Sequence, residues 1–507
     1  MGMNRLHINL AGLLALAGIL CCGGAQAEDL ENTFYAMGTA FFQEPAPPAE
    51  QAAIAAELGY AGLSYERGLE IPKEMLDAVD AHDVRLFCVY LPVSVEPGVS
   101  GVPEHISKAF DMLKGRDTLV WLTMVSKTYE CSSEEGDADA VRILRDIAAA
   151  ADEAGLRLAL YPHVNNWVER ARDAQRVAEK AGRANLGATF NLCHWLAEGG
   201  DEPAADVLKD MLPKLFMLTL NGADCEGQGW NRLIQTLDQG SYDIHGFLQD
   251  VHNVGYKGPI GLQCYGIQGD PREMLTNSMN AWKHLRSGID ADWVKPFADG
   301  LGGFRDSTGE WTMAGDVTQD PDDPKAFTWT AGGCEAVNGP EGRTAHLVTK
   351  AEHGDIVAHI EFMVPEGSNS GVYFQGRYEI QVLDSWGVAA PEHSDCGGIY
   401  QRWDDNRDPK GFEGRPPRVN AARRPGQWQT FDVLFRAPRF DASGNKTANA
   451  MFVRVEHNGV VIHENQEVTG PTRAAMYAGE QPRGPIMLQG DHGPVAYRNL
   501  RFHELGK

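Results

Sequence analysis

The first half of the chain alternates short apolar runs with longer amphipathic stretches. Apolar positions recur at helical spacing in 50–58, 138–154, 168–181 and 244–254, which predicts helices there. The strand-like runs around these segments are 33–41, 61–65, 85–91, 119–125, 157–161, 186–190, 215–220 and 259–264. Eight strand-then-helix units predict an N-terminal (β/α)8 TIM barrel, because a doubly wound sheet rarely needs so many regular units.

The second half has a different pattern. The alternation stops near residue 292, and a stretch rich in Gly, Asp and Pro follows over 299–324. Beyond it, short alternating runs are separated by turn residues, and Asn458-Gly459 is a type I′ hairpin signal. The runs are 344–349, 355–362, 371–374, 378–383, 429–435, 450–456, 459–463 and 485–488. We therefore predict a TIM barrel over 28–291 and an all-β sandwich over 292–507.

The N-terminus resembles an export signal. The apolar run 10–22 follows Arg5 and leads through small residues to Ala27, which predicts a signal peptide over 1–27, cleaved after Ala27, and a periplasmic or secreted protein. The run is too short to span a membrane, and no other stretch is long and apolar enough to do so. Cys21 and Cys22 offer a lipoprotein alternative, which Leu20 opposes because a small residue is expected there.

Charge and cysteine usage narrow the classes further. The chain has 70 acidic and 45 basic residues, a net charge of −25, which opposes binding of a nucleic acid. Outside the leader the cysteines are odd in number and show no CxxC spacing, which predicts neither a disulfide framework nor a zinc site. Cys88, Cys193, Cys225 and Cys264 adjoin apolar runs, so we interpret them as small buried hydrophobic residues.

Polar residues follow the strands of the predicted barrel. Because catalysis in such barrels occurs at the carboxyl ends of the strands, these positions are the candidates for a site. Amides and histidines among them offer donors and acceptors suited to sugar hydroxyls, although any single one could be an ordinary loop residue. The ring comprises Glu66, Tyr90, Lys127, His163, Asn191, His194, Asn221, Asp224 and Gln263.

This half resembles the xylose-isomerase-like sugar isomerase and epimerase barrels. The resemblance covers about 35–286 and rests on segments 58–63, 190–195, 220–224 and 255–263. It implies a divalent metal held by carboxylates and a histidine at the ends of strands four, six, seven and eight.

The chain departs from that ligand set. Asn191, Asn221 and Gln263 stand where an Asp, a His and a Glu belong, and 125–127 supplies no carboxylate. Neutral amides remove the charge that holds a hard cation, so we predict no metal and no other cofactor. His163 and His194 remain as candidate acid/base or sugar-binding groups.

In the second half, Arg377, Glu379 and Gln381 alternate on one strand and so share one face. This face could be an ordinary solvent face of a sandwich or a binding face. Aromatic, amide and imidazole side chains suited to sugars occur at Asn369, Tyr400, Trp428, His463, Gln489 and His492.

This half closely resembles the 3-keto-disaccharide hydrolase domain family, a concanavalin-like jelly roll. Six short motifs occur in order, at 369–371, 378–384, 398–400, 426–428, 458–459 and 484–489, and lead to 497–500. The resemblance implies a carbohydrate substrate already oxidised at C3, and hence a sugar 3-dehydrogenase acting upstream.

The resemblance implies cleavage either by elimination and hydration or by direct hydrolysis with two carboxylates. We assign Glu379 as base or acid, Asp384 as its partner, and His492 as proton carrier. Arg377 and Gln381 would contact the ketone or hydroxyls.

Three functions remain open from sequence. The barrel could bind or convert the keto-sugar product as an isomerase or epimerase does, or it could be a degenerate support. Alternatively, the whole chain could be a non-catalytic carbohydrate-binding protein. Endonuclease IV repair enzymes share this type of barrel, but export, charge and the missing carboxylates oppose that activity.

Overall fold

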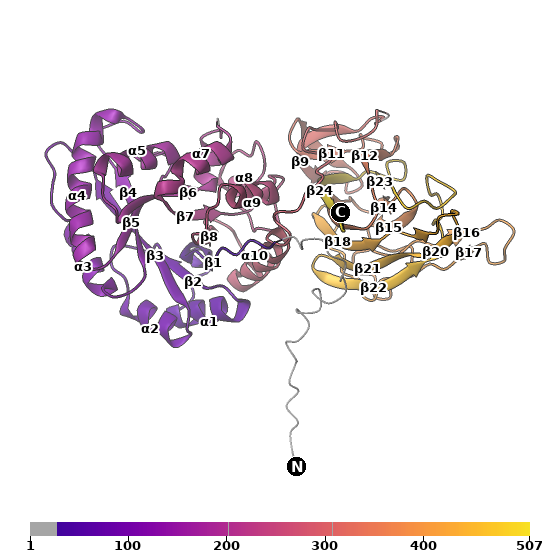
Figure 1. Ribbon diagram of the computed structural model, residues 1–507, viewed down its shortest axis with the longest axis horizontal. Coiled ribbons are helices and arrows are strands. Elements are labelled where there is room, and N and C mark those ends of the chain that lie inside the picture. Colours follow the sequence, from indigo (N-terminus) through magenta and orange to yellow (C-terminus); the bar gives the residue numbers. More distant parts are fainter. Residues whose placement is uncertain (1–27, 201, 307, 507) are drawn as a thin grey trace, which may run out of the picture.

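The computed structural model describes residues 28–200, 202–306 and 308–506. The leader predicted over 1–27 lies outside the described residues. The ribbon shows two lobes side by side, an α/β barrel followed by a β-rich region (Figure 1).

The N-terminal lobe is a closed barrel of eight parallel strands, as the sequence predicted. Closure is made by β1, which pairs with both β2 and β8. The strands are β1 (Phe34–Ala36), β2 (Gly62–Tyr65), β3 (Arg85–Ser94), β4 (Leu119–Val125), β5 (Arg157–Leu160), β6 (Leu186–Asn191), β7 (Leu215–Leu220) and β8 (Ile260–Leu262).

Helices surround the barrel (Figure 1). They are α1 (Pro48–Leu58), α2 (Lys73–Ala81), α3 (Glu104–Leu113), α4 (Asp137–Glu153), α5 (Ala171–Ala181), α6 (Leu192–Ala197), α7 (Ala204–Met211), α8 (Trp230–Leu233), α9 (Ile244–Asn253) and α10 (Pro271–Leu285). Their apolar faces join the strands in one large core. A separate buried cluster that includes Tyr35, Phe87, Trp121 and Met217 comes from alternate strand positions, as expected for a packed barrel interior.

The predicted first strand is shorter than its apolar run. It ends at Ala36, and Gly38–Phe41 form a 3-10 turn. A Cβ on Gly38 would lie 2.6 Å from the Ser64 carbonyl oxygen and 2.7 Å from Glu66 Oε2, so only glycine allows this close approach. The turn carries Thr39 over the end of the barrel.

The C-terminal lobe consists mainly of two antiparallel sheets. The larger has the order β10-β9-β11-β24-β13-β18-β21-β22 and the smaller the order β12-β23-β14-β15. The larger contains β9 (Thr312–Gln319), β10 (Phe327–Ala331), β11 (Glu335–Val337), β13 (Ile356–Met363), β18 (Gln429–Arg436), β21 (Ala450–His457), β22 (Val460–Val468) and β24 (Ala496–Glu504). The smaller contains β12 (Leu347–His353), β14 (Asn369–Phe374), β15 (Tyr378–Leu383) and β23 (Gly484–Leu488).

One apolar core is shared by both sheets, which makes the lobe a sandwich. Phe362 and Phe431 of the larger sheet and Phe374 and Ile380 of the smaller one belong to the same buried cluster. The predicted hairpin is present, since β21 and β22 pair with Asn458 and Gly459 both at positive φ between them.

The two lobes meet through polar and charged side chains and one covalent bond. His284 on α10 lies 3.5 Å from Glu456 of β21, and Arg423 contacts Asp238 at 3.2 Å. A disulfide joins Cys225 after β7 to Cys334 before β11. The interpretation of Cys225 as an unpaired buried hydrophobe was therefore wrong. Its partner is 109 residues away, a separation that spacing rules do not detect.

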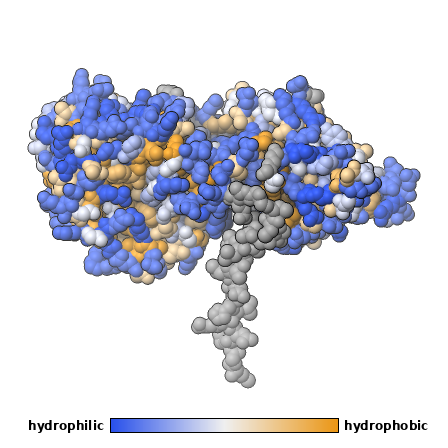
Figure 2. All heavy atoms as spheres, in the orientation of Figure 1, coloured by the Kyte–Doolittle hydropathy of each residue, from blue (hydrophilic) through white to orange (hydrophobic). Residues whose placement is uncertain are grey.

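The surface view shows a mostly hydrophilic face with apolar patches over the barrel lobe (Figure 2). In the part of the chain that the structure describes, no helix has the length and apolar character needed to cross a bilayer.

Candidate active sites

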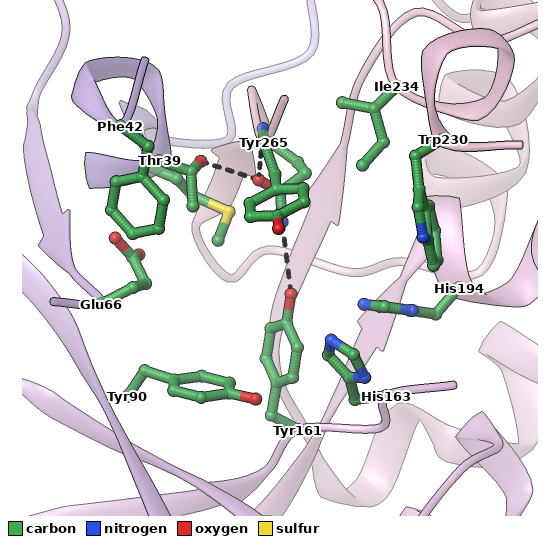
Figure 3. A pocket seen from close by; sticks show the side chains of 12 residues that line it. Thr39, Phe42, Glu66, Tyr90, Tyr161, His163, His194, Trp230, Ile234 and Tyr265 are labelled. Carbon is green, nitrogen blue, oxygen red and sulfur yellow. Dashed lines mark hydrogen bonds between the residues drawn. The ribbon is translucent and has the colours of Figure 1, made fainter. Parts of the chain in front are cut away.

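A cavity of about 260 Å³ opens at the carboxyl ends of the barrel strands. It includes five residues of the predicted ring, namely Glu66, Tyr90, His163, His194 and Gln263 (Figure 3). The other lining residues are Met37, Thr39, Phe42, Tyr161, Trp230, Ile234 and Tyr265. Aromatic side chains line much of the cavity, and carboxyl, phenol, imidazole and amide groups reach into it.

Glu66 follows β2 and occupies one wall of this cavity. The Ser64 hydroxyl donates a hydrogen bond to Oε1, whereas Oε2 is buried without a hydrogen-bond partner. Burial raises the pKa of Glu66 to about 7, against the opposing effect of the Ser64 hydrogen bond. The carboxyl can therefore gain or lose a proton near neutral pH.

His163 and His194 form the opposite wall, with ring centroids 4.2 Å apart (Figure 3). The backbone carbonyl and N–H of Val164 fix the tautomers of the two imidazole rings. Its carbonyl oxygen lies 2.8 Å from His163 Nδ1, which must donate, and the backbone N–H of Val164 donates to His194 Nδ1 at 3.3 Å. His163 Nε2 is thus left as an acceptor and His194 Nε2 as a donor. Burial, reinforced by His163, lowers the pKa of His194 to about 3, so His194 is neutral.

Gln263 closes the cavity between these walls. Its Oε1 accepts from Thr39 Oγ1 at 2.7 Å and from the backbone N–H groups of Cys264 and Tyr265 at 3.0 Å each. Its Nε2 donates to the Tyr161 hydroxyl at 3.4 Å. The amide orientation is therefore fixed by four contacts.

The remaining ring residues have other partners. Asn191 Oδ1 accepts from Thr219 Oγ1 at 2.8 Å, and Asn221 Nδ2 donates to the carbonyls of Gly222 and Leu233 at 2.7 Å each. Asp224 pairs with Arg232 at 2.8 Å, and Lys127 is exposed. None of these four residues lines the cavity.

These contacts test whether the barrel fits the divalent metal that its resemblance implies. The oxygens of Gln263 and Asn191 already accept hydrogen bonds, and Asn221 directs its amide nitrogen to carbonyls, which leaves its Oδ1 as a single free but neutral oxygen. All three groups are neutral, and a hard cation needs free oxygen ligands that include anionic ones. The residues present do not fit such an ion. Among the described residues no group of three or more His, Cys, Asp or Glu side chains is arranged to hold a metal.

A second candidate site lies on β15 of the sandwich. Glu379 and Gln381 share a face, and both are 3% exposed, so this is a covered face and not the solvent face that the sequence left open. Gly371 on β14 pairs with Gln381, and a Cβ at Gly371 would approach Glu379 Oε1 to 2.4 Å. Burial raises the pKa of Glu379 to about 8, against the opposing effect of a hydrogen bond from Tyr373.

Several predicted residues surround this carboxyl. Asn369 Oδ1 accepts from Gln381 Nε2 at 3.2 Å, and the backbone N–H of Tyr400 donates to the Glu379 carbonyl at 3.2 Å. Gln489 is buried, and its N–H donates to the Gly371 carbonyl at 2.9 Å. These residues are therefore spread along the β14–β15 pair, from Asn369 at its open end to Glu379 near its turn.

Other predicted residues have different local roles. Arg377 donates to the carbonyls of Gly479 and Gln375 and stacks on the Tyr477 ring. Asp384 lies five positions beyond Glu379, about 16 Å along a strand, and accepts from the N–H groups of Gly367 and Trp386. His492 is exposed, with Nδ1 2.5 Å from Asp491 Oδ1.

Sequence reasoning missed some side chains at both sites. Trp230 reaches the barrel cavity from the start of α8 and Tyr265 from the loop after β8, and Tyr373 meets Glu379 only through strand pairing. The polar pairing of Tyr373 with Glu379 could have been found from the short Gln375-Gly376 turn between β14 and β15.

Comparison with known families divides the chain as the two lobes do. Residues 52–285 match the family model described as a xylose isomerase-like TIM barrel, and residues 292–503 match the 3-keto-alpha-glucoside-1,2-lyase-like domain.

Individual relatives are more distant. A 3-dehydroshikimate dehydratase of Pseudomonas aeruginosa is 33% identical over 154 residues, which are 28% of this chain and 23% of that protein; this chain thus spans less than a quarter of that relative. A putative glycosyl hydrolase from Parabacteroides distasonis is similar at 27% identity over 42% of this chain and 84% of its own, with a TM-score of 0.32. A 3-keto-D-glucoside 4-epimerase from E. coli is similar at 15% identity over 50% and 99%, with a TM-score of 0.39.

Proposed function

We propose that this chain, which joins a xylose isomerase-like TIM barrel to a 3-keto-alpha-glucoside-1,2-lyase-like domain, is an exported enzyme that cleaves 3-keto-glycosides in its sandwich. The two matched families are enzymatic, and together they indicate a sugar-modifying enzyme. The barrel binds or converts the keto sugar that cleavage releases.

The observation that carries this proposal is the environment of Glu379. It is a buried carboxyl with a pKa of about 8, on the same strand face as Gln381 and beside Gly371, whose missing Cβ leaves room for it. A general acid/base works best when its pKa lies near the working pH. Burial of a carboxyl destabilises the folded state, so a purely structural role does not explain why a carboxyl is buried at this position.

The chemistry follows from the ketone at C3, which acidifies the hydrogen on C2. Ionised Glu379 takes the C2 proton, the C1–C2 double bond forms, and the C1–O bond breaks. Protonated Glu379 then gives the same proton to the departing oxygen, which leaves as an alcohol. Addition of water across the double bond gives the free 3-keto sugar, so the net reaction consumes one water. Gln381 and Asn369 orient the sugar hydroxyls, and we propose that no divalent metal takes part.

Export is supported by two independent features. The leader pattern over 1–27 predicts secretion, and the Cys225–Cys334 disulfide is of a kind that persists in oxidising compartments. The substrate must already be oxidised at C3, so we place a sugar 3-dehydrogenase upstream.

The test is release of the aglycone from a 3-keto-glucoside by the purified protein, with and without EDTA. We expect release that EDTA does not change, and a loss of at least about 100-fold in Glu379→Gln. Glu366→Gln, an exposed carboxylate of the same lobe, is the matched control and should retain activity. Unchanged turnover in Glu379→Gln would remove its role. Binding without any release would indicate a carbohydrate-binding protein instead.

A further inference from the structure

The barrel cavity contains groups for chemistry of its own, separate from the sandwich. Glu66 stands on one wall and the His163–His194 pair on the other, and the space between them is about 260 Å³ (Figure 3). That volume is slightly below the range of about 300–1,000 Å³ that is usual for ligand cavities. It suits a single sugar ring better than a glycoside with a large aglycone.

We propose that the barrel mouth is a metal-independent proton-transfer site that enolises a free keto monosaccharide, with Glu66 as the base and His194 Nε2–H as the donor to the ketone oxygen. The choice of a keto sugar as substrate class rests on the proposed function of the sandwich. The site itself rests on the residues of the barrel alone.

The first support is the state of Glu66. The Glu66 carboxyl lines the cavity, and its Oε2 is packed beside Gly38 without a side-chain hydrogen-bond partner, so no other side chain neutralises it. Ser64 holds the other oxygen in place, and Gly38 leaves the room that Oε2 occupies. The carboxyl is therefore preorganised toward the cavity.

The second support is the pair of fixed tautomers. Because the Val164 N–H occupies His194 Nδ1, the proton of this neutral ring is on Nε2, the nitrogen left free to act as a donor. A neutral imidazole N–H can donate a hydrogen bond that polarises a carbonyl without placing a full positive charge in the site. His163 presents an acceptor beside it, which suits a neighbouring sugar hydroxyl.

The proposed step is balanced within the site. Glu66 takes a proton from the carbon next to the ketone, and the electron pair of that C–H bond forms the carbon–carbon double bond. The carbonyl electron pair moves to oxygen, where the His194 hydrogen bond stabilises the developing charge. Return of a proton to the same carbon completes a cycle that needs no oxidant, reductant or metal.

The experiment follows exchange of the hydrogen next to the ketone of 3-keto-glucose for deuterium in D2O by proton NMR, using EDTA-treated protein. This substrate has no glycosidic bond, but ionised Glu379 of the sandwich could itself take the hydrogen on C2, so every variant is measured in a Glu379→Gln background. We expect exchange in that background and a decrease of at least about 100-fold when Glu66→Gln is added. Glu70→Gln, an exposed carboxylate four residues along the same loop, should exchange at the normal rate.

Ser64→Ala provides a second readout that remains informative if Glu66→Gln does not fold. The Ser64 hydrogen bond lowers the pKa of Glu66, so its loss should move the pH midpoint of exchange upward from about 7. A purely structural role would change the amplitude without moving the midpoint.

Absence of exchange, exchange that EDTA abolishes, or equal exchange in Glu66→Gln would each overturn the proposal. Persistent exchange without aglycone release would instead contradict the proposed function of the sandwich and leave the barrel proposal standing.

Discussion

Removal of the Cys225–Cys334 disulfide should destabilise the protein and impair the barrel site together. The bond closes a segment with a sequence separation of 109 residues. The chain-entropy relation gives about 5 kcal/mol for a loop of this length. Native contacts across the same interface, such as Arg232 with Asp316 and Arg423 with Asp238, remain after the bond is removed. These contacts hold the two lobes together in the folded protein that lacks the disulfide. They do not reduce the extra conformational entropy that the unfolded chain gains when the disulfide is absent.

The perturbation is the double variant Cys225→Ser/Cys334→Ser, which removes both cysteines of the bond and so leaves neither of them as a free thiol. Guanidinium unfolding followed by circular dichroism measures the effect, with each lobe treated as its own transition because a two-lobed chain need not unfold in one step. We expect the double variant without reductant to unfold at the midpoint of the unmodified protein in dithiothreitol, both well below the oxidised midpoint. Cys131→Ser, which removes an exposed free thiol, is the matched control and should not change the midpoint.

The same bond has a functional consequence that can be measured. Cys225 belongs to the segment between β7 and α8, and Trp230 at the start of α8 lines the barrel cavity. Loss of the bond should therefore slow deuterium exchange in the barrel while leaving aglycone release in the sandwich near its normal rate. Equal midpoints for the oxidised and reduced proteins, with the bond verified by mass spectrometry, would refute the entropic reasoning.

Three further predictions concern the sandwich. Burial raises the pKa of Glu379 to about 8, so the ionised fraction of this carboxyl increases as pH rises. We therefore expect kcat/KM for cleavage to increase from pH 6 and to level off above about 8. A kcat/KM that falls over this range would show that Glu379 acts as an acid. Gly371→Ala would place a Cβ 2.4 Å from Glu379 Oε1 and should abolish most aglycone release, whereas Gly479→Ala, with open space at its Cβ, should not. Arg498→Met leaves the buried carboxylates of Glu335 and Glu361 without their shared partner and should cost about 3–5 kcal/mol in denaturant unfolding, with exposed Lys350→Met as the control.

Periodicity predicted the barrel well because its strands are buried on both faces. The runs 119–125 and 215–220 coincide with β4 and β7, and the polar residues that follow strands two, five, six and eight do meet at one mouth. The rule that barrel sites lie at the carboxyl ends of strands was sufficient to place Glu66, His163, His194 and Gln263 at one cavity, and their roles there stay a prediction.

The features that sequence reasoning missed depend on partners distant in the chain. β24 escaped notice because it carries Arg498 and Arg501, which are buried only because Glu361 and other acidic groups come from elsewhere. β9 contains Gly315 and Asp316 and was interpreted as part of the boundary stretch. The state of Glu379 likewise depends on which segments cover β15, and no local pattern specifies that.

The two lobes are joined at two separate places, by the backbone near residues 290–294 and by the Cys225–Cys334 bond. Ion pairs such as Arg232 with Asp316 and Arg423 with Asp238 cross the same interface, so the lobes are held at more than two points and rotation of one lobe against the other is opposed. Since Cys225 precedes the segment that carries Trp230 to the cavity, the bond to the sandwich also anchors one wall of the barrel mouth.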